Sequence, residues 1–458
     1  MLDQEQYNPA KAHKALALST IAFTVCFAVW TIFSIIGVKI KQDLGLNETE
    51  FGLLVATPVL TGSISRIFLG IWTEKYGGRL VFTVLMLATA MAVYLLSAVE
   101  TYAIFLIAAL GVGLAGGSFI VGIAYTSEWY DKRHQGTALG IFGAGNVGAA
   151  VTNFGAPFLV LAFGWAATAQ IYSVVLVAMA IIFWLVTEND PRLQKRKAEG
   201  TRPTPLAEQL EPLKKLQVWR FALYYFFVFG GFVALASWLP RYYVGAYDLS
   251  LSTAGTLAAL YALPASVFRA LGGWLSDRFG ARTVMYWTFG VSLACLFVLS
   301  YPETRYVVAG IEGPIEFAFG VPLAVFTLMT VALGFFMSLG KAAVYKHIPV
   351  YYPDHVGSVG GLVGMIGGLG GFVLPIAFGV MNDLTGVWTS CFMLMFLVVA
   401  VSLTWMHFAI LRMERRRVPA LGEEEHFRYL PEIQPDYKRE GESRPDAPAR
   451  HNTEAHAH

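Results

Sequence analysis

Long apolar runs constrain the fold of this chain more than any other feature of its sequence. About twelve runs of roughly 20 mostly apolar residues follow one another along the 458 residues, at 16–38, 51–73, 79–98, 102–127, 137–162, 166–187, 219–240, 252–275, 282–300, 317–340, 356–381 and 387–411. As an α-helix, each run is long enough to cross the ~30 Å hydrocarbon core of a bilayer. The sequence therefore predicts an all-α membrane protein with twelve transmembrane helices.

The composition agrees with lipid as the main solvent of this chain. Hydrophobic residues make up 56% and charged residues 14%, with a mean hydropathy of +0.56, whereas soluble domains are about 25% charged. The first run is too long for a signal peptide and no cleavage site follows it, so we expect it to remain as a helix. Cys26, Cys295 and Cys391 lie in apolar stretches without metal-ligand spacing, so we expect no disulfide, metal or other cofactor.

A polar, proline-containing linker lies between the sixth and seventh runs. It predicts an N-terminal six-helix bundle at 1–187, a linker at 188–217 and a C-terminal six-helix bundle at 218–412. The charged segment at 413–458 is expected to be a disordered tail.

Lysine and arginine residues predict the orientation of the helices. If the N-terminus is cytoplasmic, that side carries the basic linker together with Lys11, Lys14, Lys75, Arg79, Lys132, Arg133, Arg278, Arg282, Arg412, Arg415, Arg416 and Arg417. The other side carries Lys39, Lys41, Arg241 and Arg305. Because cytoplasmic loops are enriched in positive residues, we expect a multi-pass protein of the bacterial plasma membrane with both termini in the cytoplasm.

One loop sequence occurs twice, once in each half. SRIFLGIWTEKYGGR (65–79) aligns with FRALGGWLSDRFGAR (268–282) at an offset of 203. The matched positions are Gly70, Glu74, Lys75 and Arg79 in the first copy and Gly273, Asp277, Arg278 and Arg282 in the second. Parallel repeats of this kind occur in secondary transporters. A carboxylate and cations at a helix end stabilise that end locally, so we expect gating or structural roles for these residues.

The repeated G-x3-[DE]-[RK]-x-G-x-[RK] loop resembles that of the major facilitator superfamily. The resemblance implies two six-helix bundles that rock around a central site.

Glycine-rich segments raise the alternative of a dinucleotide-binding site. GIFGAGNVGAA (140–150) contains the G-x-G-x-x-G pattern of dinucleotide-binding turns, but no strand precedes it and no acidic residue follows about 20 positions on. Small residues recur there every four positions, and they do so again in the eleventh run: Gly140, Ala144, Gly148, and Gly360, Gly364, Gly368. Such stripes let helices pack closely in lipid. We therefore reject a dinucleotide site.

The same segments carry a second resemblance. ALGIFGAGNVGAA (138–150) and GGLVGMIGGLGGFVLP (360–375) resemble the glycine-rich motifs of the nitrate/nitrite porter family, and the likeness extends over the whole membrane region. It implies nitrate and nitrite as substrates. It also implies substrate contacts for a tyrosine, an asparagine and two stacking phenylalanines, here Tyr225, Asn146, Phe119 and Phe229. Gly145 and Gly367 are expected to let the helix backbones approach closely near the substrate. For each phenylalanine, core packing is an equally good explanation.

Two arginines are predicted to lie near the bilayer centre, where a charged side chain is energetically costly. Arg66 lies eight residues before Glu74, or ~12 Å along the helix, which places it near the bilayer centre, and Arg269 occupies the equivalent position. A charge at this depth costs about 2.5–3.5 kcal/mol, and no Asp or Glu lies well inside any run. Backbone carbonyls or water could solvate the arginines. We favour an anion instead, since a planar guanidinium matches planar oxyanions.

The end of the tenth run is also basic. Lys346 and His347 are typical of a cytoplasmic helix end, whereas Lys341 lies deeper and can titrate if desolvated. This stretch resembles the proton-linked branch of the nitrate porters, so Lys341 is a candidate for proton coupling. Exchange of nitrate for nitrite stays open as the other coupling mode, because the helices offer no carboxylate to carry protons.

The sequence leaves two alternatives to a nitrate/nitrite transporter: a transporter of another small anion such as formate, and a non-transporting membrane sensor of nitrate. An enzyme is not expected, since the helices hold no nucleophile, base and orienting group in a recognisable arrangement. We expect a monomer that contacts lipid and its anionic substrates but no nucleic acid.

Overall fold

The computed structural model describes residues 9–130, 135–190, 211–352 and 356–417. Residues 418–458 of the predicted tail and most of the predicted linker lie outside these residues, whereas residues 413–417, also predicted as tail, are the helical end of α18. The N-terminal half contains α1 (Pro9–Trp30), α2 (Phe33–Leu44), α3 (Glu48–Tyr76), α4 (Gly78–Leu96), α5 (Tyr102–Val112), η2 (Gly113–Gly117), α6 (Ser118–Ser127), α7 (Gln135–Gly143), η3 (Ala144–Val147) and α8 (Gly148–Val186). The C-terminal half contains η4 (Glu211–Lys214), α11 (Leu216–Tyr225), η5 (Phe226–Gly231), α12 (Phe232–Tyr247), α13 (Leu251–Val267), α14 (Arg269–Phe279), α15 (Ala281–Leu299), α16 (Leu323–Tyr351), α17 (Val356–Thr385) and α18 (Ser390–Arg417).

The number of membrane crossings agrees with the prediction of twelve. By length and composition, ten helices of the described chain can cross a membrane, and α13 with α14, bent by 41°, make an eleventh. The helix from Thr137 to Val186 has 50 residues, which is far more than the ~30 Å core requires. Gly164 inside it has φ 81° and ψ 167°, a conformation that glycine adopts without strain. The chain therefore reverses at Gly164 and crosses twice in this segment.

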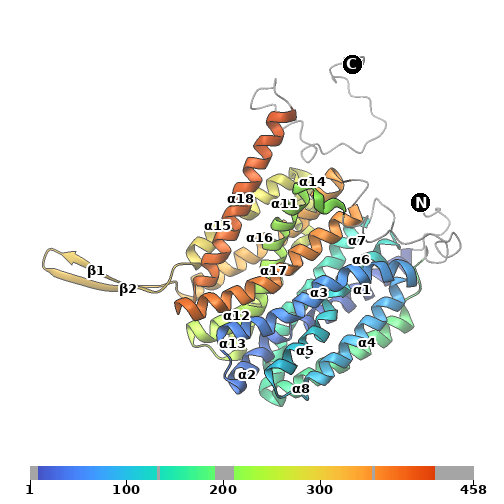
Figure 1. Cartoon of the computed structure of the whole chain (residues 1–458), viewed down its shortest axis with the longest axis horizontal. Coiled ribbons are helices and arrows are strands. Elements are labelled where there is room, and N and C mark those ends of the chain that lie inside the picture. The colour runs from blue at the N-terminus through green and yellow to red at the C-terminus, as the bar shows by residue number, and fades with distance from the viewer. Residues whose placement is uncertain (1–8, 131–134, 191–210, 353–355, 418–458) are drawn as a thin grey trace, which may run out of the picture.

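The helices form one layered bundle with two distinguishable ends (Figure 1). We call the end where α8 finishes and α11 begins the linker end, and the opposite one the hairpin end. Contacts between the halves run along α3 with α17 and along α8 with α13, and Figure 1 shows α3 beside α17. The interface between the halves is therefore built from helix pairs that cross the whole membrane.

The two copies of the repeated loop turn in the same way. Gly77 follows α3 with φ 92° and ψ 146°, and Gly280 follows α14 with φ 87° and ψ 137°. A side chain at either position would be strained, so these glycines allow the sharp turn into α4 and α15. The start of α3 is fixed separately by a capping box between Asn47 and Glu50.

The mostly helical chain also contains a β-hairpin between α15 and α16, which was not predicted from the sequence. β1 (Thr304–Gly310) pairs with β2 (Gly313–Phe319) in antiparallel register. Residues 317–319, assigned from the sequence to the tenth apolar run, belong to β2, and α16 starts only at Leu323. Aromatic and β-branched residues at alternate positions favour a strand here, and the hairpin projects from the bundle (Figure 1).

Candidate substrate-binding site between the two halves

Arg66 lies on α3 at the contact between the two halves. Its side chain is buried, with 4% of the residue exposed, and Nη1 donates a hydrogen bond to the carbonyl of Gly364 on α17 at 2.7 Å. Its Nε has no hydrogen-bond partner among the described residues. A backbone carbonyl thus solvates one donor of Arg66, as the alternative explanation required, and leaves Nε unpaired.

Arg269 lies at the bend between α13 and α14. It is 8% exposed, and its Nη1 has no hydrogen-bond partner among the residues described. A Cβ atom on Gly143 of α7 would lie 3.1 Å from Cδ of Arg269. The side chain of this C-terminal-half residue therefore reaches the N-terminal half.

The two guanidinium groups share an aromatic neighbour. Their Cζ atoms lie 5.5 Å (Arg66) and 5.4 Å (Arg269) from the centroid of the Phe119 ring. Arg66 also lies 5.4 Å from the Phe229 centroid, and Arg269 lies 5.6 Å from that of Tyr345. Contacts of this kind attract a cation to a ring face but do not neutralise its charge.

The predicted aromatic residues come together around the arginines. Phe119 stacks on Phe229 across the interface, with centroids 6.5 Å apart and planes at 25°. Tyr225 stacks on Phe229 at 5.0 Å and 11° and meets Tyr345 edge-on at 5.0 Å. Both phenylalanines are buried, so they fill the interface and face the cations at once.

Carboxylates are absent from this cluster within the described part of the chain. Asp190 is the one buried carboxylate among those residues, and it lies beyond α8, where it accepts a hydrogen bond from the backbone N–H of Gly78. The cluster thus carries two permanent positive charges that no described acidic side chain balances.

Two further predicted residues have buried polar atoms without partners. Both side-chain polar atoms of Asn146 lack a hydrogen bond within the described residues, as does the hydroxyl of Tyr225. Each residue is fully buried. Buried polar groups are normally paired, so these atoms are candidates for ligand contacts.

The predicted glycines differ in what they contact. A Cβ atom on Gly367 of α17 would lie 2.5 Å from Cδ1 of Tyr225, so this glycine lets α17 pack against the tyrosine. A Cβ atom on Gly145 would instead lie 2.5 Å from the ring of Phe23 on α1. The stripe on α7 and α8 is also uneven, because Gly148 is tightly packed whereas Gly140 faces open space.

Lys341 lies on α16 beside the same cluster. It is fully buried, and its Nζ donates to the carbonyl of Ala265 at 2.9 Å. Nζ lies 3.2 Å from the centroid of Phe232 and 5.8 Å from that of Phe229. No carboxylate of the described chain pairs with it, so Lys341 is a third buried basic group next to the arginines.

The repeated-loop residues lie at the linker end, apart from the arginines. Asp277 forms an ion pair with Lys346, and Arg79 donates to the carbonyl of Trp184 while its Cζ lies 4.2 Å from the indole centroid. Arg282 donates to the hydroxyl of Tyr351 at 3.3 Å. Lys75 and Arg278 lie over aromatic rings of their own helices.

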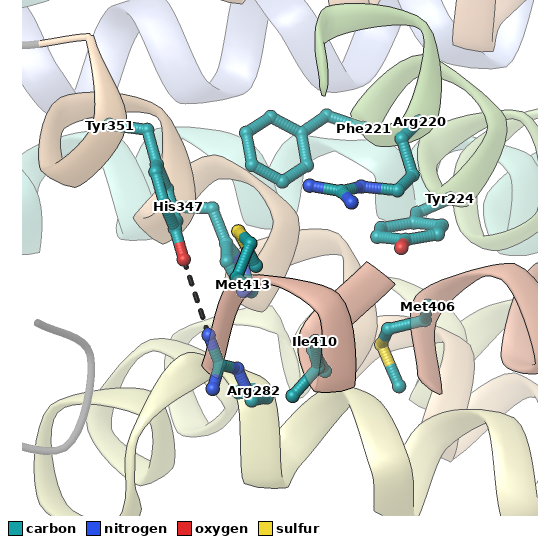
Figure 2. A pocket seen from close by; sticks show the side chains of 9 residues that line it. All are labelled: Arg220, Phe221, Tyr224, Arg282, His347, Tyr351, Met406, Ile410 and Met413. Atoms are coloured by element: carbon teal, nitrogen blue, oxygen red, sulfur yellow. Dashed lines mark hydrogen bonds between the residues drawn. The ribbon is translucent and has the colours of Figure 1, made fainter. Parts of the chain in front are cut away.

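A small hollow at the linker end was not anticipated from the sequence. Figure 2 shows the nine side chains that line it: Arg220, Phe221, Tyr224, Arg282, His347, Tyr351, Met406, Ile410 and Met413. They come from α11, α15, α16 and α18, all in the C-terminal half. The hollow includes neither Arg66 nor Arg269, so it is separate from the cluster at the interface.

Polar contacts close the interface at the hairpin end. Glu48, at the start of α3, pairs with Arg241 of α12. Asp383 of α17 accepts hydrogen bonds from the backbone N–H groups of Glu48 and Thr49 at 3.1 and 2.8 Å, where a carboxylate stabilises the helix start. We call Glu48, Thr49, Arg241 and Asp383 the outer clasp. The clasp was not predicted from the sequence, because it joins three segments that are far apart in the chain.

Tyr345 is a site residue that sequence reasoning missed. It contacts Arg269 and Tyr225, and its hydroxyl donates to the carbonyl of Gly360 at 3.1 Å. Its position four residues after Lys341 places both on one face of α16, and that spacing was available in the sequence.

Comparison with known proteins identifies the family. The sequence pattern of the Major Facilitator Superfamily matches residues 18–311 and 242–435. The chain is 46% identical over 429 residues to the probable nitrate/nitrite antiporter NarK1 of Thermus thermophilus, covering 89% of this chain and 95% of that protein. The chain belongs to the nitrate/nitrite porter family of this superfamily.

Other relatives and solved structures agree with this family and fold. The nitrite extrusion protein of Bacillus subtilis is 29% identical to this porter over 403 residues, covering 87% of this chain and 95% of that one. A bacterial homologue of the human lysosomal transporter Spinster superposes with a TM-score of 0.66 at 15% identity over 88% of this chain and 97% of its own. The nucleoside transporter NupG, as a mutant, superposes with a TM-score of 0.65 at 14% identity over 86% and 99%.

Proposed function

We propose that this porter is a secondary transporter that moves nitrate and nitrite across the plasma membrane, with the anion held between Arg66 and Arg269. The names of its relatives support these substrates. The observation that carries the proposal is the position of the two arginines, which come from opposite halves, are buried, and lie over the same Phe119 ring.

Charge compensation is the first part of the mechanism. A buried charge without a partner costs several kcal/mol, and the described residues supply no carboxylate to either arginine. An entering monoanion balances one charge and accepts hydrogen bonds from the unpaired Nε of Arg66 and Nη1 of Arg269. Binding therefore draws its free energy from donors that are already desolvated.

Shape and dehydration account for the selectivity we expect. Nitrate and nitrite are planar, so their oxygens match paired guanidinium donors and fit between ring faces. Sulfate and phosphate are tetrahedral and lose more hydration free energy in an aromatic site. Chloride cannot accept two parallel hydrogen bonds from one guanidinium.

Alternating access requires that contacts between the two halves break and form again. With both termini cytoplasmic, the outer clasp closes the extracellular side, and the Glu48–Arg241 pair must separate before an anion enters from outside. The anion then draws Arg66 and Arg269 together and favours re-closure of the halves around it. Such a ligand shifts the equilibrium by its difference in affinity for the two states.

For coupling, we propose Lys341 as the group that distinguishes proton symport from nitrate/nitrite exchange. Import of one anion against an inside-negative potential costs about 2.3 kcal/mol per 100 mV, which co-moved protons or an outgoing nitrite can supply. Lys341 is buried beside the cluster and bonded only to a backbone carbonyl among the described residues. Unlike an arginine, a lysine can release its proton in such a place, and this favours symport.

Competition for uptake tests the substrate assignment. In proteoliposomes containing the full chain, excess nitrite should suppress uptake of labelled nitrate, whereas excess chloride or sulfate should leave it nearly unchanged. Formate that competes as strongly as nitrite would favour the broader small-anion transporter. Saturable nitrate binding without any uptake or counterflow would favour a sensor and contradict the proposal.

A further inference from the structure

The hairpin between α15 and α16 has one apolar face that no described element covers. Residues directly opposite each other in the register point to the same side of the ribbon, and the pairs Thr304–Phe319, Tyr306–Phe317 and Val308–Ile315 make up this face. We call these six residues the hairpin face. Its Tyr306 and Phe317 rings stack with centroids 5.3 Å apart.

The opposite face of the same ribbon is mixed in character. Its cross-strand pairs are Arg305–Ala318, Val307–Glu316 and Ala309–Pro314, so both charged side chains of the paired strands lie on this side. The hairpin is therefore amphipathic, with its charges directed away from the hairpin face.

Stability requires a partner for the hairpin face. An isolated two-stranded hairpin is marginal in water, and it becomes stable when its apolar face packs against something. All residues of β2 are exposed in the described structure, including Ile315, Phe317 and Phe319. The missing partner must come from outside the described chain.

The base of the hairpin adjoins the surface that faces lipid. Only residues 300–303 and 320–322 separate the strands from α15 and α16. These two helices expose Phe297 and Leu328 near the same end. Between α15 and the hairpin, the ring of Tyr301 packs edge-on against that of Phe319, with centroids 5.3 Å apart. Tyrosine side chains such as Tyr301 are enriched at membrane–water interfaces, because the ring is apolar and the hydroxyl is polar.

A second copy of the chain is a poorer partner than lipid. Stable protein interfaces use roughly 20–30 residues a side, whereas the hairpin face offers six. A lipid surface requires no matching shape, and it accepts an apolar face with charges on the opposite side.

We propose that the hairpin face lies on the outer surface of the bilayer, in contact with phospholipid acyl chains and headgroups next to α15 and α16. The hairpin then anchors the C-terminal half at the membrane boundary on the side opposite the linker. This inference is independent of the transported substrate.

Two adjacent valines provide a matched test. Val308 belongs to the hairpin face and Val307 to the opposite face, with 46% and 66% exposed. The native cysteines Cys26, Cys295 and Cys391 are buried, so a thiol-reactive NBD fluorophore labels Val308→Cys or Val307→Cys selectively, with the unmodified chain as the background control. Each labelled full-length protein is reconstituted in vesicles of phosphatidylethanolamine and phosphatidylglycerol that contain nitroxide-labelled lipids.

The expected result is emission at shorter wavelength and several-fold stronger quenching by lipid nitroxides at position 308 than at position 307. Equal, weak lipid quenching at both positions would overturn the proposal, and so would equal, strong quenching. Protection of position 308 that coincides with thiol cross-linking between copies, without quenching by lipid, would assign the face to a second copy instead.

Discussion

Arg66 of the N-terminal half lies over the ring of Phe229 of the C-terminal half, with its Cζ 5.4 Å from the ring centroid. Any rocking of one half against the other changes this contact, because the two residues move with different bundles. The same holds for Arg269 and Phe119 in the opposite sense. The symmetry of the sequence repeat thus reappears as two crossed contacts, each between an arginine of one half and a phenylalanine of the other.

The close approach of α17 to Tyr225 predicts the effect of adding a methyl group. Gly367→Ala should strongly reduce nitrate transport, since its Cβ would lie 2.5 Å from the Tyr225 ring. Gly361→Ala on the same helix is the matched control, because a Cβ there meets no atom within 4 Å. Uptake of labelled nitrate, normalised to the amount of inserted protein, measures both. Equal activity of the two variants would contradict the close-approach explanation.

The unpaired hydroxyl of Tyr225 predicts a loss of affinity on its removal. Tyr225→Phe should raise the nitrate KM about tenfold, which corresponds to one hydrogen bond to a charged ligand of about 1.5 kcal/mol. Tyr224→Phe is the control, since the neighbouring Tyr224 packs edge-on against Phe289, with centroids 5.4 Å apart, on the side of α15. A Tyr225→Phe porter with an unchanged KM would mean that the hydroxyl does not touch the anion.

The outer clasp predicts a shift toward the outward-open state when it is broken. Arg241→Ala removes the C-terminal-half partner of Glu48, which keeps only Lys41 of its own half at 3.5 Å. Loss of a charge-assisted bond of about 1.5–3 kcal/mol across the interface should change the open fraction about tenfold or more. The readout is the rate at which a membrane-impermeant maleimide labels Ser34→Cys, a buried position on α2 whose hydroxyl donates to Asn153.

A second ion pair serves as the control for the clasp. Lys11 and Glu188 pair at the linker end, with 47% and 46% of their side chains exposed, and exposed pairs contribute little. Lys11→Ala should leave the labelling rate of Ser34→Cys unchanged. If Arg241→Ala also leaves it unchanged, the clasp does not hold the closed state.

The buried position of Lys341 predicts that a mutation can separate proton-driven uptake from nitrate/nitrite exchange. Lys341→Gln should abolish uptake driven by a proton gradient while nitrate/nitrite exchange persists, because exchange moves no proton. Lys346 lies on α16 like Lys341, and its exposed side chain pairs with Asp277 of α14. Lys346→Gln should retain both modes. Undiminished proton-driven uptake by Lys341→Gln would exclude this lysine from coupling.

Much of the fold and of the central cluster was predictable because the relevant signals are local or repeated. The apolar runs set the crossings, and the 203-residue offset paired Arg66 with Arg269. The family resemblance supplied Phe119, Phe229 and Tyr225, which the structure brings together with the arginines.

The remaining features depend on contacts between distant segments. Asp383 meets Glu48 across 335 positions of sequence, and nothing in either segment indicates the other. The hairpin was missed because its strands are short and merge with the apolar run of α16. Gly145 is predicted to let backbones approach near the substrate, and the side chain that a Cβ there would meet first is Phe23 of α1, a contact that only helix packing reveals.

The most direct measurement of the central claim is nitrate uptake by Arg66→Lys and Arg269→Lys porters beside an Arg305→Lys control on the exposed hairpin. Lysine keeps the positive charge but loses the planar, paired donors, so both site variants should lose most nitrate uptake while the control matches the unmodified chain. Near-normal uptake by both site variants would contradict the proposal that the two arginines clamp the anion.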